Sequence, residues 1–163
     1  MSLAQHILSS FDVVEYCVNA YLADLSDQEL LVRPAPECNH IAWQLGHLIC
    51  SEAEHRQQIF PHAELQLPSG FTEKHTRQTA SLDDPEAFCS KQEYLHAMAE
   101  QRRITKSLLT SLTDQELMAP APAALTYFGN TVGCVFSGET VHWMMHTGQW
   151  VVIRRLLGKP PLF

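Results

Sequence analysis

The residues of this chain best suited to chemistry are two histidines, His142 and His146, in the run GETVHWMMHTGQW. On a helix, residues four positions apart lie about 40° apart around the axis, so both imidazoles point to the same side. That spacing suits two ligands of one transition-metal ion. Apolar residues such as Val135, Met145 and Ile153 share this helical face, so we expect the pair to face the core.

A third histidine, His47, is the expected partner of this pair, because a firmly held metal with a position left open for chemistry needs at least three protein ligands. His47 lies in the middle of a helical segment, NHIAWQLGHLICSE, beside its apolar stripe. The other histidines fall near a helix end, in a long loop, or on polar or charged faces: His6, His40, His55, His62, His75 and His96. A lone buried histidine more often only hydrogen-bonds, but two at helical spacing favour a ligand role. The sequence therefore predicts a three-histidine site of His47, His142 and His146.

Two polar residues on the same segment, Glu139 and Gln149, are candidates for support of the metal ligands. Glu139 stands three residues before His142 and could orient an imidazole or act as a base. Gln149 lies one turn beyond His146 and could donate a hydrogen bond. Alternatively, Glu139 is a solvated residue of the first helical turn and Gln149 a packing amide.

A fourth ligand could come from Cys50 or Glu54, which follow His47 on the same segment. Cys50 lies three residues after His47 and can approach the metal, although a buried cysteine more often serves as a small hydrophobe. A fourth protein ligand would close the site and indicate a metal that only stabilises the fold. An open position facing a cavity would indicate catalysis.

Three imidazoles suit zinc, nickel, iron and copper, and we expect zinc or nickel first. A metal at such a site lowers the pKa of bound water or of a thiol, which predicts hydrolysis or S-transfer to a small molecule. Two alternatives stay open. One is a non-catalytic metal- or ligand-binding module that acts during stress, and the other is Fe(II)-dependent chemistry of thiols and oxygen at the same histidines.

The segments that position these residues carry helical periodicity, and no segment alternates apolar and polar residues for long enough to predict a sheet. We expect helices over residues 2–24, from the N-cap Asn39 to Phe60, from Pro85 to Leu112, and from a start between Asn130 and Ser137 to Gly158. The inward residues expected on the third helix are Phe88, Leu95, Ile104, Leu108 and Leu112. Residues 61–84 should form a long connection. The predicted fold class is all-α.

The chain also repeats itself, since LSDQELLVRPAP at residues 25–36 resembles LTDQELMAPAP at residues 112–122. In each copy a hydroxyl residue precedes a glutamate by three positions, as in a capping box, which predicts a short helix. The repeat arises either from an ancient duplication or from convergent turn chemistry. In both cases the helices that carry His47 and His142 occupy equivalent places, so their histidines can converge.

Length, charge and composition predict the number of domains, the classes of partner and the location of the protein. A length of 163 residues predicts one domain, and a net charge of −7 without a basic cluster argues against a nucleic-acid partner. The sequence has no long apolar run and no basic, apolar leader, so we expect neither a membrane span nor a signal peptide. Five cysteines without paired spacing fit a reducing compartment, so a cytoplasmic location is expected.

The order of three motifs resembles that of the DinB-like (YfiT-like) superfamily of metal-dependent enzymes. The motifs read IAWQLGHL, ETVHWMMHTGQW and RRLLGKPP in this chain, and the resemblance extends from the first helix to the last prolines. It implies a four-helix bundle of up-down-down-up type with two long crossing connections, often assembled as a homodimer. It also implies a divalent metal held by His47, His142 and His146. Members of this kind resemble transferases that use a low-molecular-weight thiol, so a small-molecule substrate is expected.

Overall fold

The computed structural model describes residues 1–63 and 65–163, and their regular secondary structure is helical. The four long helices are α1 (Leu3–Leu22), α2 (Ile41–Ile59), α3 (Lys91–Ser111) and α5 (Val132–Leu156). The short elements are η1 (Glu29–Leu31), η2 (Glu73–His75), η3 (Pro85–Ala87), α4 (Asp114–Leu117) and η4 (Ala123–Phe128). Within the described residues, strand-like pairing is confined to one isolated bridge between Pro120 and Thr131. The all-α prediction is confirmed.

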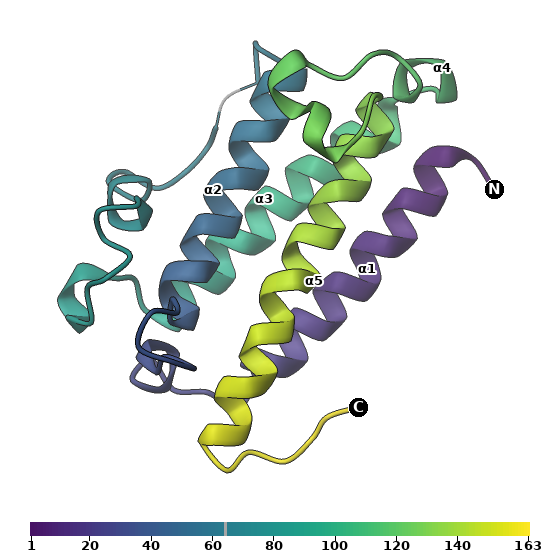
Figure 1. The fold of residues 1–163 in the computed structure, drawn as a ribbon. Helices are drawn as coiled ribbons and strands as arrows, with labels where there is room; N and C mark the ends of the chain where they lie inside the picture. Colours follow the sequence, from purple (N-terminus) through teal and green to yellow (C-terminus); the bar gives the residue numbers. More distant parts are fainter. Residues whose placement is uncertain (64) are drawn as a thin grey trace.

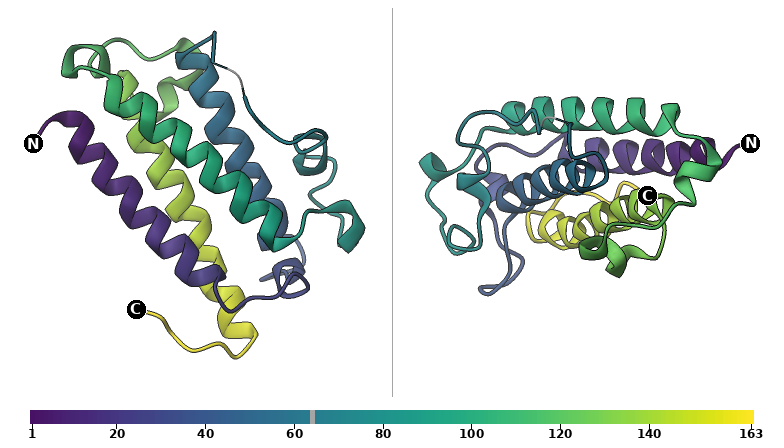
Figure 2. Two further views of the ribbon diagram at one scale, coloured as in Figure 1. Left: turned by 180° about the vertical axis from the view of Figure 1, so that it is seen from behind. Right: turned by 90° about the horizontal axis from the view of Figure 1, so that it is seen from above.

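The four long helices lie side by side, with α1 against α5 and α3, and α2 against α3 and α5 (Figures 1 and 2). Helices α1 and α5 run in one direction, and α2 and α3 run in the other (Figure 1). The connection between α2 and α3 therefore runs the length of the helices, outside α2. The connection between α3 and α5 stays at the end where α3 stops and α5 begins. Of the two expected crossing connections, the described residues show one.

The helix starts differ from the prediction at two places, and side-chain caps explain both. Helix α2 begins after His40 rather than Asn39, because the Nδ1 atom of His40 accepts a hydrogen bond from the Trp43 amide at 3.1 Å. Pro85 begins only the short η3, and α3 begins after Ser90. Ser90 and Glu93 form a capping box there, a serine–glutamate spacing that the prediction overlooked.

The two repeat copies behave as their capping-box spacing predicts. The Ser26 amide donates to Glu29 at 2.8 Å, and the Thr113 amide donates to Glu116 at 2.8 Å. In both copies the glutamate amide donates back to the hydroxyl oxygen, at 3.3 and 3.2 Å respectively. Each copy thus starts a short helical turn, η1 in the first and α4 in the second.

The inward face of α3 is polar in its middle, so the predicted set of inward residues is correct only in part: Leu95 and Leu112 pack against the core, but they do not form its most buried face. Its buried residues are Tyr94, Ala97, Met98, Gln101, Arg102, Thr105 and Leu109. The expected residues Leu95, Ile104, Leu108 and Leu112 are only partly buried, whereas Phe88 is buried as expected. Apolar periodicity misplaces this face because charged side chains of α2 are buried against it and require partners.

Those partners form a buried network between α2 and α3. The Arg56 guanidinium donates to the side chains of Gln101 at 2.5 Å and Thr105 at 3.2 Å. Arg102 forms an ion pair with Glu52 at 3.2 Å, and the indole of Trp143 donates to the same carboxylate at 3.1 Å. The network ties α3 to both helices that carry the site histidines.

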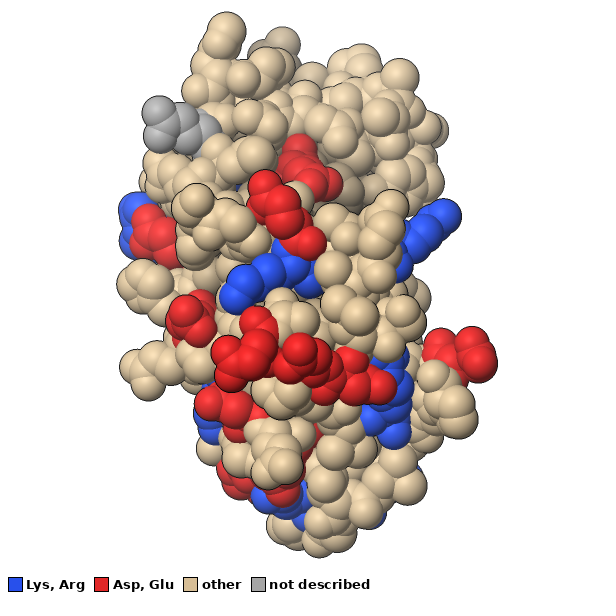
Figure 3. Space-filling model, turned by 90° about the vertical axis from the view of Figure 1, so that its left-hand side faces the viewer, with Lys and Arg blue, Asp and Glu red and all other residues tan. Residues whose placement is uncertain are grey.

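The distribution of charged and apolar side chains on the surface is relevant to the partners predicted above. Acidic and basic side chains are interspersed on the face of the long connection, with an acidic band across it (Figure 3). No helix within the described residues is both long and apolar enough to cross a lipid bilayer.

Several large apolar side chains of α1 and α5 are exposed: Val13, Tyr16, Val141, Met144, Met145 and Val152. The homodimer stays a prediction.

Candidate metal centre

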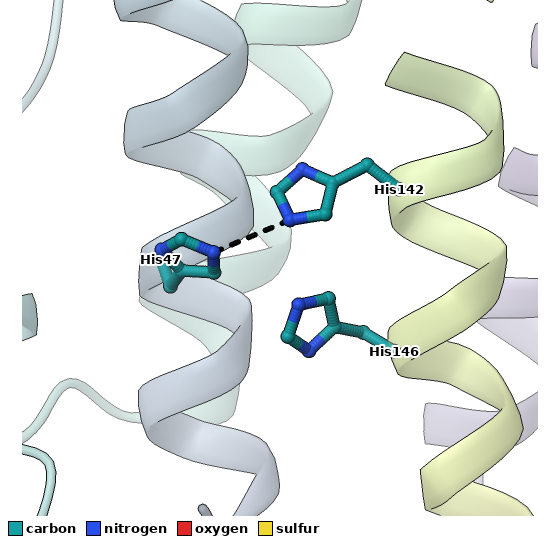
Figure 4. Close-up of side chains that lie close together, drawn as sticks. All are labelled: His47, His142 and His146. Atoms are coloured by element: carbon teal, nitrogen blue, oxygen red, sulfur yellow. Dashed lines mark hydrogen bonds between the residues drawn. The ribbon is translucent and has the colours of Figure 1, made fainter. Parts of the chain in front are cut away.

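The three predicted histidines converge between α2 and α5 (Figure 4). One ring nitrogen of each of His47, His142 and His146 lies within 4.8 Å of those of the other two. The Nε2 atoms of His47 and His142 are 3.3 Å apart. The geometry therefore places three nitrogen donors around one point, as a metal ion requires.

The burial of the three histidines differs from the expectation that they face the core. All three are half-buried, at the edge of the buried stripe. The deepest positions of α5 are taken by Trp143 and Trp150, which are fully buried. The helices are therefore packed at these positions, and the rings of His47 and His142 reach a cavity.

Gln44, one turn before His47, holds the ring of His146. The Oε1 atom of Gln44 accepts a hydrogen bond from the Trp150 indole at 2.9 Å and lies 3.1 Å from Nδ1 of His146. An oxygen can only accept, so Nδ1 of His146 carries the proton, and its Nε2 presents a lone pair. Gln149 accepts a hydrogen bond from Nε2 of Gln44 at 3.2 Å, so it contacts Gln44 instead of donating to a histidine as expected.

Trp43 covers the ring of His47. The two rings stack with centroids 5.1 Å apart and planes 11° apart. The indole nitrogen of Trp43 donates to the carbonyl of Thr76 at 2.9 Å, which ties the long connection to this side of the site. These contacts limit the rotation of the His47 ring.

Burial keeps the three imidazoles neutral. It lowers the pKa of His142 to about 3 and that of His146 to about 4, and it lowers the pKa of His47 as well. Mutual repulsion of the charged forms adds to the effect at His142 and His146. Neutral imidazole is the form that binds metal, so the donor set fits a divalent transition metal. His142 also leaves its buried Nδ1 atom without a hydrogen-bond partner.

A cavity of about 450 Å³ adjoins two of the histidines. Its lining residues are His47, Ser51, His55, Tyr127, Phe128, Gly138, Val141, His142 and Met145. The Phe128 ring of η4 packs directly against Gly138, where a Cβ atom would lie 2.1 Å from the ring. The cavity therefore depends on the absence of a side chain at Gly138.

Neither Cys50 nor Glu54 joins the histidine cluster, which among the described residues consists of the three imidazoles alone. The Cys50 sulfur lies 3.9 Å from the Thr72 hydroxyl, and burial raises the pKa of its thiol to about 12. Glu54 is exposed. A protonated buried thiol fits the packing role of Cys50.

Glu139 is buried, which contradicts its alternative as a solvated residue. Its carboxylate contacts Nδ1 of His55 rather than the neighbouring His142. The Nε2 atom of His55 lies 3.0 Å from the hydroxyl of Tyr127. The prediction missed His55 and Tyr127. The spacing of His55, two helical turns beyond His47, was a usable signal, whereas nothing local connects Tyr127 to the site.

The comparisons with known proteins agree with this architecture. The sequence profile of the DinB superfamily matches residues 11–150. The chain belongs to the DinB superfamily.

A conserved protein from Enterococcus faecalis has a similar crystal structure, with a TM-score of 0.77 and 21% sequence identity. The similarity covers 98% of this chain and 99% of that one, and it concerns the fold alone. No curated protein matches the chain. The three histidines of this DinB-superfamily protein all lie within the matched residues, and membership is compatible with metal binding.

Proposed function

We propose that this DinB-superfamily protein is a metalloenzyme in which His47, His142 and His146 hold a divalent transition metal, zinc or nickel. The proposed reaction is S-transfer from a low-molecular-weight thiol to a small electrophile, or hydrolysis of a small molecule. The observation that carries the proposal is the convergence of three neutral imidazoles beside a cavity of about 450 Å³. A divalent metal bound there supplies Lewis acidity, which lowers the pKa of a thiol or water.

The chain's own residues prepare this site in three ways. Burial keeps the imidazoles free of protons, so their lone pairs are available near neutral pH. Gln44 and Trp43 hold two of the rings in place. The third contribution is the wall of the cavity, where Phe128, Val141 and Met145 favour a substrate with an apolar part.

A catalytic site is favoured over a purely structural one because three ligands leave a coordination position open. Structural zinc sites are usually closed by four protein ligands. Among the described residues no cysteine or carboxylate joins the three histidines to close this one.

Elemental analysis of untagged protein purified without added metal is the first test. We expect near-stoichiometric metal in the wild type and in His96→Ala, an exposed control on α3, and its loss in His142→Ala and His146→Ala. If the wild type holds no metal and binds none on titration, the proposal is wrong. Bound iron in place of zinc or nickel would favour the Fe(II)-dependent alternative.

Exogenous ligands then separate a catalytic site from a structural one. Cobalt(II)-loaded protein should change its visible spectrum when 2-mercaptoethanol is added, because an open position admits the thiol. A spectrum that does not respond to thiol, azide or imidazole would indicate a closed site and would favour the non-catalytic module.

A further inference from the structure

A second group of polar side chains lines the cavity beside the three histidines. Tyr127 of η4, His55 of α2 and Glu139 of α5 form a continuous chain of hydrogen bonds. Two of its members, Tyr127 and His55, share the cavity with His47 and His142. The chain runs from an exposed phenol to a carboxylate that is only 3% exposed.

Glu139 stands at the buried end of this chain of hydrogen bonds, and its surroundings determine which groups can balance its charge. One carboxylate oxygen contacts His55, and the other, Oε2, is buried without a partner. Burial raises the pKa of Glu139, whereas the hydrogen bond and charge of His55 lower it. Behind the carboxylate, Glu52 of α2 and Arg102 of α3 offset each other as an ion pair. The hydrogen-bonded partner of Glu139 that can carry a compensating proton is His55, and the buried guanidiniums of Arg56 and Arg102 add positive charge near the carboxylate.

The hydrogen bonds also assign the protons on His55. When Nδ1 donates to the Glu139 carboxylate, Nε2 carries the lone pair and accepts from the Tyr127 hydroxyl at 3.0 Å. A carboxylate behind an imidazole holds its tautomer and stabilises the imidazolium form. Glu139 and Tyr127 contact His55, and the imidazoles of His47 and His142 lie near enough to interact with it. A metal held by those two histidines opposes a proton on His55, and the carboxylate of Glu139 favours one.

We propose that His55 accepts the proton of a thiol or water that binds in the cavity, with Tyr127 relaying the proton and Glu139 positioning the imidazole; this inference rests on the proposed function. The S–H or O–H bond breaks, and its electron pair stays on sulfur or oxygen. The proton bonds to the phenol oxygen of Tyr127 while the phenol's own proton moves to Nε2 of His55. The resulting imidazolium is held against the carboxylate of Glu139.

A count of released protons tests this assignment without an activity assay. Calorimetric titration of zinc-loaded protein with 2-mercaptoethanol at pH 7, in buffers of different ionisation enthalpy, gives the protons passed to the buffer. We expect close to none for the wild type and about one per thiol for His55→Gln, because the acceptor is then missing. The exposed control His96→Gln should match the wild type. Equal counts in the wild type and His55→Gln would overturn the proposal.

Two further variants separate the roles along the chain. Glu139→Gln should release a fraction of a proton, between the wild type and His55→Gln, because the imidazolium loses its counter-charge; a count equal to the wild type's would exclude a positioning role. Tyr127→Phe should keep the wild-type count but slow thiol binding at least about tenfold, as loss of a positioned proton donor does. An unchanged rate would remove Tyr127 from the path.

The failure of this inference is distinguishable from that of the proposed function. If zinc does not bind, the proposed metal site fails, and if zinc binds but the thiol does not, the S-transfer form of the proposed function fails. If both bind and the counts are equal, only the role of His55 fails. Should His55→Gln not fold, nitrogen NMR of the wild-type His55 ring decides: an imidazolium signal after thiol addition supports the proposal, and a neutral ring overturns it.

Discussion

Two groups of buried or half-buried histidines differ in what their ring nitrogens contact. His75 uses both nitrogens in short hydrogen bonds, to the Phe71 carbonyl at 2.7 Å and the Tyr94 hydroxyl at 2.7 Å. His40 likewise caps α2 with Nδ1 and lies 3.0 Å from the Leu82 carbonyl with Nε2. In the other group, His47, His142 and His146 direct ring nitrogens at one another instead.

The pKa shifts do not separate the two groups, although His40 and His75 are buried and His47, His142 and His146 are half-buried. Burial lowers the pKa of His75 to about 4 and that of His146 to about 4. What differs is the use of the lone pair, since a satisfied histidine stabilises the fold and an unsatisfied one can bind a ligand. Histidine function is therefore indicated by the partners of both ring nitrogens rather than by the direction of the pKa shift.

The largest expected effect is a contrast between two alanine variants, one in each group: the first should lose its metal and the second should lose stability. His142→Ala should lose nearly all bound metal and stay folded, because its half-buried ring has few partners to leave unpaired. His75→Ala should keep its metal but lose about 2–4 kcal/mol of unfolding free energy, because it leaves a cavity and removes partners of the Phe71 carbonyl and the Tyr94 hydroxyl, the latter keeping only the Cys89 amide. Elemental analysis and urea denaturation measure the two effects. Metal loss in folded His75→Ala would break the distinction.

Two glycines lie close in the sequence to histidines of the proposed metal site, Gly46 beside His47 and Gly148 two residues after His146, and they differ in the space around them. A Cβ atom at Gly46 would lie 2.0 Å from the ring of His75, so Gly46→Ala should cost about 1–3 kcal/mol of unfolding free energy. Gly148 has no atom within 4 Å of such a Cβ, so Gly148→Ala should gain about 0.5–1 kcal/mol. Thermal unfolding of the two variants provides the measurement. Equal melting temperatures would show that His75 moves aside freely.

Gln44 contacts His146 of the second group, and it also accepts a hydrogen bond from the Trp150 indole. Gln44→Leu removes the acceptor of His146 Nδ1, and loss of such a partner costs about 10- to 100-fold in metal affinity. Competition with a chromogenic zinc chelator measures the change. Gln149→Ala, which removes only a contact to Gln44, is the milder control, and equal losses in both variants would contradict this ranking.

The last expected effect is the pH dependence of stability, which develops gradually over the range from pH 6.5 to pH 4. Because burial lowers the pKa of His75 to about 4, the folded state resists a proton that the unfolded chain accepts near pH 6.5. Stability of the metal-free protein is therefore fully present above pH 6.5 and falls toward pH 4, by at most about 1.4 kcal/mol per pH unit for each such histidine. His75→Phe should reduce this slope by one histidine's share in urea denaturation. An unchanged slope would show that His75 does not hold its neutral form.

Much of the site was predictable because it depends on local geometry. The spacing of His142 and His146 places them on one helical face, and Gly158 ends the helix region with a φ of +70°, as its position predicts. Assignment of the α2 cap to Asn39 instead of His40 failed because an imidazole seldom serves as an N-cap. The inward face of α3 also escaped prediction, since its polar residues acquire partners only from α2.

The sequence by itself determined the helices, the short capped turns and the pairing of His142 with His146, because helical periodicity and capping act within a few residues. Only the tertiary structure decided that His47 meets this pair and that Tyr127, His55 and Glu139 join across three elements. The physical reason is that these distances depend on how helices pack, and packing sums contacts between residues far apart in the chain.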